Sequence, residues 1–132
     1  MIKIEKIEKI EKITSIYSLW NPSDIAHIKA LEWSVNNLLI KCYCQLRAGS
    51  NKWPDKSKYF FEISIGFKNI SNLKLDFNGS GLHSVSGFDI VDVSENGLEG
   101  INFCIEDYEN GSIEFNCEAI EIISVSDTAE LR

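Results

Sequence analysis

The chain has 132 residues, 44% of them apolar, and a formal charge of −7 at neutral pH. These values predict a single folded domain over residues 1–132 and exclude an intrinsically disordered chain. The acidic balance also argues against direct binding to nucleic acid, because that requires clustered lysine and arginine to displace counterions from the phosphates.

The charge is distributed unevenly. Residues 75–132 contain thirteen acids and one base, Arg132, so their formal charge is 1 − 13 = −12. Residues 1–74 hold the other twelve bases and seven acids, a charge of +5. A surface that serves solubility alone usually mixes both signs, and self-repulsion on this scale costs stability. The asymmetry therefore favours a positively charged partner, with a solvated surface as the alternative explanation.

The first twenty residues predict the only helix. Isoleucine recurs at positions 4, 7, 10 and 13, and Glu5 and Glu8 each precede a lysine by four residues, a spacing that favours helix. We expect this helix to run from about Ile4 to Leu19, because Pro22 disfavours helix just before it. A strict period of three spirals around a helix of 3.6 residues per turn, so the isoleucines do not all share one buried face.

Residues 25–126 predict a mostly antiparallel sheet. Apolar and polar residues alternate over 25–46, on both sides of an Asn36-Asn37 turn that would pair Val35 with Leu38, and Glu32 would meet Lys41 on the other face. Further strands are expected at 59–67, 73–77, 88–93, 101–108 and 112–125. The predicted fold class is α+β, with one N-terminal helix and about seven strands curled into a half-barrel or a sandwich.

Two registers compete in the last hairpin. A two-residue Asn-Gly loop would set Cys104 opposite Cys117. A three-residue loop with a bulge at Gly111 would set Glu106 opposite Glu114 and bury the alternate residues, which are all apolar. We favour the second register because its core is cleaner. It places the two cysteines on opposite faces, where they cannot form a disulfide.

The sequence offers no metal or cofactor motif. Two histidines and a single Cys-x-Cys pair are too few for a zinc site. Charges from Lys3 onward interrupt the apolar run that a secretory signal needs, so we expect a cytoplasmic protein whose four cysteines are free thiols in the core.

Catalytic residues are equally hard to find. Cys104 with His83 is a conceivable nucleophilic pair, and two of the many carboxylates could act as general acid and base, but neither has a recognisable catalytic context. We expect a protein that is not an enzyme, with a small hydrolase as an alternative. A further alternative is a β-sandwich that binds a small molecule or sugar, with Trp53 at the tip of the 48–57 loop and Tyr59 and Phe60 lining an aromatic pocket.

Two acidic segments, Asp89–Glu95 and Cys104–Glu109, stand in a short chain rich in predicted strands. In these features it resembles the small acidic immunity proteins of bacterial toxin systems, particularly those of contact-dependent growth inhibition. The resemblance implies a cytoplasmic inhibitor that binds a cognate toxin domain, often a basic nuclease, and blocks its active site or its access to RNA or DNA.

The predicted contact surface follows the acidic half of the chain and carries no cofactor, metal or membrane contact. Aromatic side chains are common anchors at the centre of such interfaces. The residues expected in contact are Asp89, Asp92, Glu95, Glu99, Glu106, Glu109, Glu114 and Glu118, with Tyr108 and Trp53 as aromatic anchors.

Overall fold

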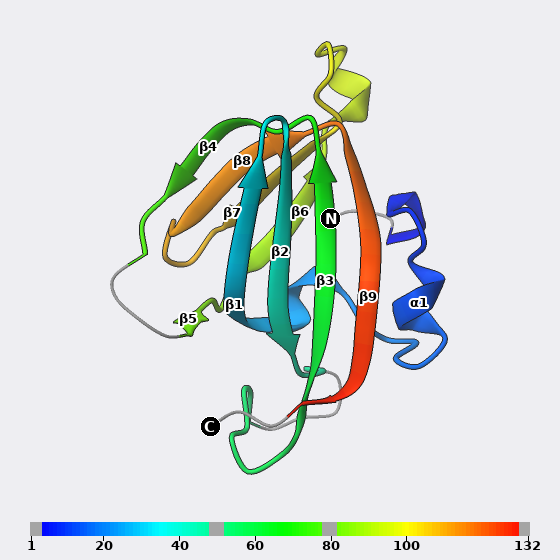
Figure 1. Ribbon diagram of the computed structural model, residues 1–132, viewed down its shortest axis with the longest axis vertical. Coiled ribbons are helices and arrows are strands. Elements are labelled where there is room, and N and C mark those ends of the chain that lie inside the picture. Colours follow the sequence, from blue (N-terminus) through cyan, green and yellow to red (C-terminus); the bar gives the residue numbers. More distant parts are fainter. Residues whose placement is uncertain (1–3, 48–51, 78–81, 130–132) are drawn as a thin grey trace.

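The computed structural model describes residues 4–47, 52–77 and 82–129, and the description of 127–129 is limited to the backbone. Two antiparallel sheets lie one behind the other (Figure 1). Sheet A has the strand order β5-β1-β2-β3-β9, and sheet B has the order β4-β8-β7-β6. The strands are β1 (Ile25–Ser34), β2 (Asn37–Cys44), β3 (Phe60–Lys68), β4 (Ser71–Leu75), β5 (His83–Ser84), β6 (Phe88–Asp92), β7 (Phe103–Asp107), β8 (Ile113–Cys117) and β9 (Ala119–Ala129).

This architecture confirms the predicted fold class, in its sandwich form and without a closed barrel. The described part of the chain has nine strands where about seven were predicted. The helical elements are short: η1 (Ile4–Lys6), α1 (Glu11–Thr14), η2 (Pro22–Asp24) and η3 (Ser94–Asn96). Among the described residues, no helix has the length and apolar character needed to cross a membrane.

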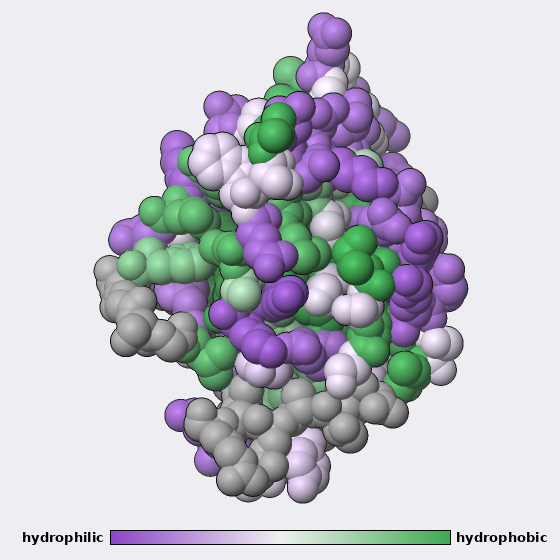
Figure 2. Space-filling view, in the orientation of Figure 1, coloured by the Kyte–Doolittle hydropathy of each residue, from purple (hydrophilic) through white to green (hydrophobic). Residues whose placement is uncertain are grey.

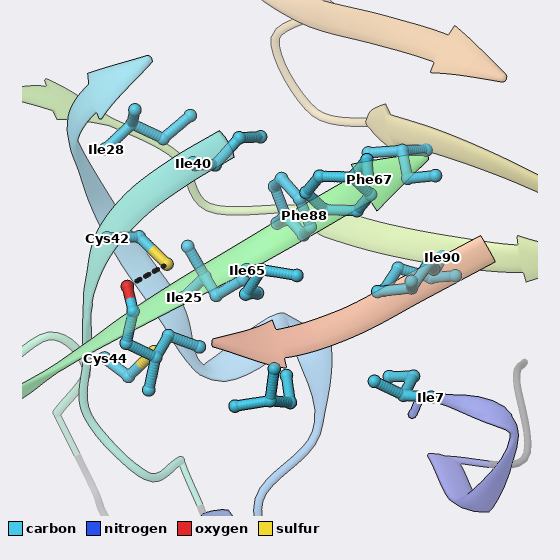
Figure 3. Close-up of a cluster of buried hydrophobic side chains, with 14 of the residues drawn as sticks. Ile7, Ile25, Ile28, Ile40, Cys42, Cys44, Ile65, Phe67, Phe88 and Ile90 are labelled. Atoms are coloured by element: carbon cyan, nitrogen blue, oxygen red, sulfur yellow. Dashed lines mark hydrogen bonds between the residues drawn. The ribbon is translucent and has the colours of Figure 1, made fainter. Parts of the chain in front are cut away.

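The core lies between the two sheets and follows the period-two pattern of the strands. Alternate residues of β2 point inward, and Ile40, Cys42 and Cys44 are each at most 1% exposed (Figure 3). Phe67 of sheet A meets Phe115 of sheet B edge to face, with ring centroids 5.0 Å apart. This geometry is favourable for aromatic pairs and fixes the two layers against each other.

The N-terminal helix prediction is wrong in extent. The only α-helix there is α1, and Lys9 has a left-handed φ of 60° that interrupts the helical path before it. The backbone of Glu8 instead joins the edge of sheet A, donating to Ile120 O at 2.8 Å and accepting from Ile122 N at 2.9 Å. Pairing with the sheet edge overrides the local helix preference because it also buries Ile7 against the core.

The first hairpin is confirmed, but its turn is one residue earlier than predicted. Ser34 pairs with Asn37, so Val35 and Asn36 form the turn in place of Asn36-Asn37. Both registers leave every side chain on the same face, so the alternation of apolar residues cannot distinguish them. Glu32 and Lys41 still approach each other, at 3.9 Å, although they are not directly opposite.

Replacing Val35 is expected to stabilise the protein. Val35 is 88% exposed and has a φ of 45°, a conformation that a β-branched residue adopts at a cost. Val35→Asn should raise the free energy of unfolding by about 1 kcal/mol, since asparagine tolerates this region. Urea denaturation measures the change. Val35→Ala removes the β-branch but lacks the short polar side chain that lets asparagine adopt this region, so it should gain less. A loss of stability in Val35→Asn would contradict the assigned turn.

Bulges in β1 change which of its residues face the core. The pairing with β2 shifts between Ile25 and His27 and again between Ile28 and Ala30. Ile25 and Ile28 consequently point into the core (Figure 3), whereas His27 pairs with Tyr43. His27 is buried as well, but it lines a cleft between distant segments of the chain.

The preferred register of the last hairpin is confirmed. Glu106 pairs with Glu114 and Phe103 with Cys117, and Gly111 has the left-handed φ of 65° that the glycine bulge requires. The strand predicted over 112–125 is, however, two strands. After Cys117 the chain passes from sheet B to sheet A, because Glu118 N bonds to Lys68 O and β9 then pairs with β3.

Candidate functional site

Three carboxylates form a row across the outer face of sheet B. Asp89 of β6 pairs with Glu106 of β7, and Glu106 pairs with Glu114 of β8. Neighbouring strands lie about 4.8 Å apart, so this carboxylate row spans roughly 10 Å. Like charges directly opposite each other destabilise a sheet. Repulsion within the carboxylate row therefore lowers the stability of the fold, although these side chains lie on the outer face and do not pack in the core.

The carboxylate row forms no ion pair with any described residue. Lys74 of β4 is the register partner of Glu114, but the two side chains form no ion pair. Other lysines neutralise acids elsewhere: Lys9 and Lys68 reach Glu121 at 2.9 and 3.2 Å. The negative charge of the row is thus left to solvent or to a partner.

The outer face of sheet A differs from this arrangement. Figure 2 shows apolar and hydrophilic side chains interspersed over it. Its charges occur in both signs, as in the pair of Lys29 with Glu62 at 2.7 Å. A solvated surface ordinarily mixes both signs in this way. The one-sided charge is therefore confined to the carboxylate row on sheet B.

Cys104 lies on the same outer face as the carboxylate row. Burial, followed by the charges of Glu106 and Glu114, raises the pKa of its thiol above the ordinary value. Cys117 points into the core, where burial raises its pKa to about 12. Neither thiol is a ready thiolate at neutral pH. His83, the conceivable partner of Cys104, lies in β5 of the other sheet and stacks on Phe77 with centroids 4.0 Å apart.

The Cys104 thiol provides a direct measure of this negative field. Replacing Glu106 and Glu114 together by glutamine should lower the pKa of Cys104, because two charges that oppose the thiolate are removed. The pKa should remain above the ordinary value, since burial is its larger cause. The rate of alkylation as a function of pH reports the change. The control double variant, Glu11→Gln with Glu32→Gln, should leave the pKa of Cys104 unchanged. If both double variants shifted this pKa equally, the field at Cys104 would not come from Glu106 and Glu114.

Two further predicted contact residues lie just beyond the ends of the strands that carry the row. Tyr108 follows β7 and is 61% exposed, so its ring is available to a partner. Glu118 lies at the crossing between the sheets and accepts a hydrogen bond from Asn69 Nδ2 at 3.1 Å. Both extend the negative or aromatic surface beyond the row itself.

Asp92, Glu95 and Glu99 lie outside the carboxylate row. Asp92 is held by the Lys6 ammonium and by Ser94, contacts that lower the pKa of its carboxyl. Glu95 and Glu99 are exposed on and after η3, in the segment that projects at the top of Figure 1. The predicted surface is therefore divided, and Asp92 is already neutralised within the chain.

Trp53 and Glu109 line a cleft at the opposite end of the molecule from η3. Trp53 is half-buried, contrary to the prediction of an exposed loop tip: its indole N–H donates to Gln45 O and the Arg47 guanidinium lies 3.5 Å from its ring centroid. Glu109 accepts a hydrogen bond from Ser86 Oγ at 2.8 Å. These two residues belong to a separate site.

Sequence reasoning missed most of this cleft. Ser84 and Ser86, together with Arg47 and Lys56, also line it, and they come from three distant stretches of the chain. No local pattern marks them. Tyr59 and Phe60, the other members of the predicted aromatic pocket, are not among its lining residues.

Among residues 4–47, 52–77 and 82–129, no three His, Cys, Asp or Glu side chains are grouped to hold a metal ion. Comparisons with known protein families, with curated protein sequences and with solved structures found no match. Any functional assignment therefore depends on the geometry and charge of the chain itself.

Proposed function

We propose that this protein is an immunity protein that binds a basic toxin domain, most simply a nuclease, through the outer face of β6, β7 and β8. The observation that carries the proposal is the carboxylate row of Asp89, Glu106 and Glu114, which forms no ion pair within the described chain and has one cation, Lys74, beside it in register. A cationic partner would relieve the repulsion within the row on binding.

The chemistry of the row supports a partner that itself binds phosphates. Three acceptor groups spaced at the strand interval match lysine ammonium and arginine guanidinium groups, which form charge-assisted hydrogen bonds to carboxylates. A nuclease presents such cations to its RNA or DNA. Carboxylates that occupy those cations would exclude the anionic substrate by competition, without any catalytic group in the inhibitor.

Tyr108 supplies the apolar part of the proposed contact. Its exposed ring beside the row can pack against a partner while the carboxylates fix orientation. Interfaces commonly combine a central aromatic anchor with charged groups that accelerate encounter. Asp92 contributes least, because Lys6 already occupies its carboxylate.

Affinity capture followed by an inhibition assay tests the proposal. The tagged protein is incubated with lysate of its source cells at low salt, and any stoichiometric partner is identified and expressed alone. We expect a basic domain with nuclease or another toxic activity, and we expect that activity to be lost when this protein is added at equal concentration. A partner that is acidic, or one that stays fully active in the complex, would contradict the immunity function.

A further inference from the structure

A cleft of about 330 Å³ opens between four segments that are distant in sequence. Its walls are the start of β1, the 53–56 stretch after β2, the 84–86 stretch around β5, and the turn between β7 and β8. This volume is at the lower end of the range for small-molecule sites. The cleft is distinct from the carboxylate row.

The cleft is held in shape by a buried polar network. The Gln45 side chain, only 9% exposed, donates from Nε2 to Asp55 O at 3.0 Å and accepts from Asp55 N at 2.6 Å. Arg47 donates from Nε to Ser23 O at 2.8 Å and from Nη2 to Ser86 O at 2.7 Å, while it stacks on Trp53. Groups fixed in this way lose little freedom when a ligand binds.

His27 provides an unused polar atom in the cleft wall. The residue is 7% exposed, its Nδ1 lies 3.1 Å from Ser84 Oγ, and its Nε2 is buried with no hydrogen-bond partner among the described residues. Burial, followed by the charge of Lys56, lowers the pKa of His27, so the ring is neutral at pH 7. When Nδ1 accepts from the Ser84 hydroxyl, Nε2 carries a proton that it can donate.

The charges of the cleft oppose those of the whole protein. Arg47 and Lys56 line it and form no ion pair with a described carboxylate, although the charge of Arg47 interacts with the buried Asp24, which accepts from Arg47 N at 3.0 Å. Glu109 is the single acid of the wall. The net charge of these three groups is +1 in a chain of −7. Ala26, Pro54 and Val85 add apolar surface. A ligand with one negative charge on a small apolar body matches this lining. A ligand with a second negative charge would be repelled by Glu109.

We propose that the cleft of His27, Arg47, Lys56 and Glu109 binds a small organic monocarboxylate. The carboxylate pairs with the Lys56 ammonium beside the His27 ring, and a small movement of that ring would let its buried, unpartnered Nε2 donate to the carboxylate. The apolar body of the ligand packs against Val85 and Pro54. Nothing in this arrangement requires a reaction of the ligand.

Three probes that share a phenyl ring test the assignment: benzoate, the neutral benzamide and the dianionic phenyl phosphate. Binding is followed by the imidazole proton signals of His27 in NMR titrations of the full chain. We expect saturable binding of benzoate, with affinity at least tenfold higher than for benzamide, because hydrogen bonds to a charged acceptor are stronger than those to a neutral one. Benzoate should also bind more tightly than phenyl phosphate.

Lys56→Gln should weaken benzoate binding about tenfold. The matched control is Lys58→Gln, which removes an exposed lysine two residues away that does not line the cleft, and it should change affinity less than twofold. Both replaced side chains are exposed, so folding is preserved. Equal affinity for benzoate and benzamide, tighter binding of phenyl phosphate, or no benzoate-induced shift at His27 would overturn the proposal.

Discussion

Replacing Glu106 and Glu114 together by lysine is expected to slow association with the basic partner roughly 10- to 100-fold at low ionic strength. The two residues pair with each other in the carboxylate row, and neither forms an ion pair with a described cation. Reversal converts an attractive field into a repulsive one at the point of first contact. Stopped-flow or biosensor kinetics with the captured toxin domain measures the association rate.

The control changes the net charge by the same amount at another place. Glu11 and Glu32 are exposed and lie outside the predicted contact, so their joint replacement by lysine should slow association only a few-fold. In about 0.5 M salt, where the Debye length falls to a few Å, the difference between the two double variants should shrink. If both double variants associate at the same rate at low salt, the slowing is an effect of net charge. The carboxylate row would then not be part of the interface.

Phe115→Ala is expected to lower the free energy of unfolding by about 3–5 kcal/mol. Phe115 is 1% exposed and meets Phe67 across the two sheets, so truncation leaves a cavity where the layers are joined. A loss of that size is a large fraction of the 5–15 kcal/mol that typically holds a domain together. Urea unfolding followed by circular dichroism gives the value.

Two further variants show whether the loss of stability comes from the packing of Phe115 between the sheets. Phe115→Leu keeps most of the apolar volume and should cost markedly less than the alanine variant. Tyr108→Ala removes an aromatic ring that is 61% exposed and should change stability by less than about 0.5 kcal/mol. If Phe115→Ala cost less than about 1 kcal/mol, the packing of sheet A against sheet B through this pair would be wrong.

Local sequence contained enough information for the last hairpin. Gly111 allows the bulge, and only one of the two registers puts Ile105 and Phe115 together in the core, so the pairing of Glu106 with Glu114 could be predicted. Asp89 joins the row through the pairing of β6 with β7, which no local turn specifies. The pairing of Glu106 with Glu114 could therefore be predicted from the sequence, whereas the position of Asp89 beside them could not.

Long-range contacts account for the predictions that were wrong. The N-terminal residues have the charge spacing of a helix, but the Glu8 backbone pairs with the free edge of β9. Trp53 lies in a loop sequence typical of an exposed turn, yet Gln45 and Arg47 draw it against the protein. In each case the deciding partner is remote in sequence or is a polar side chain without a periodic pattern.

Carboxyl-specific chemical labelling of the complex tests the central claim most directly. The free protein and its complex with the captured toxin domain are treated with a carbodiimide and an amine, and the modified residues are quantified by mass spectrometry. The carboxylate row predicts strong protection of Glu106 and Glu114 in the complex, with Glu11 and Glu32 modified equally in both states. Unchanged labelling of Glu106 and Glu114, with protection confined to Glu109 or to the acids of sheet A, would show that the partner binds elsewhere.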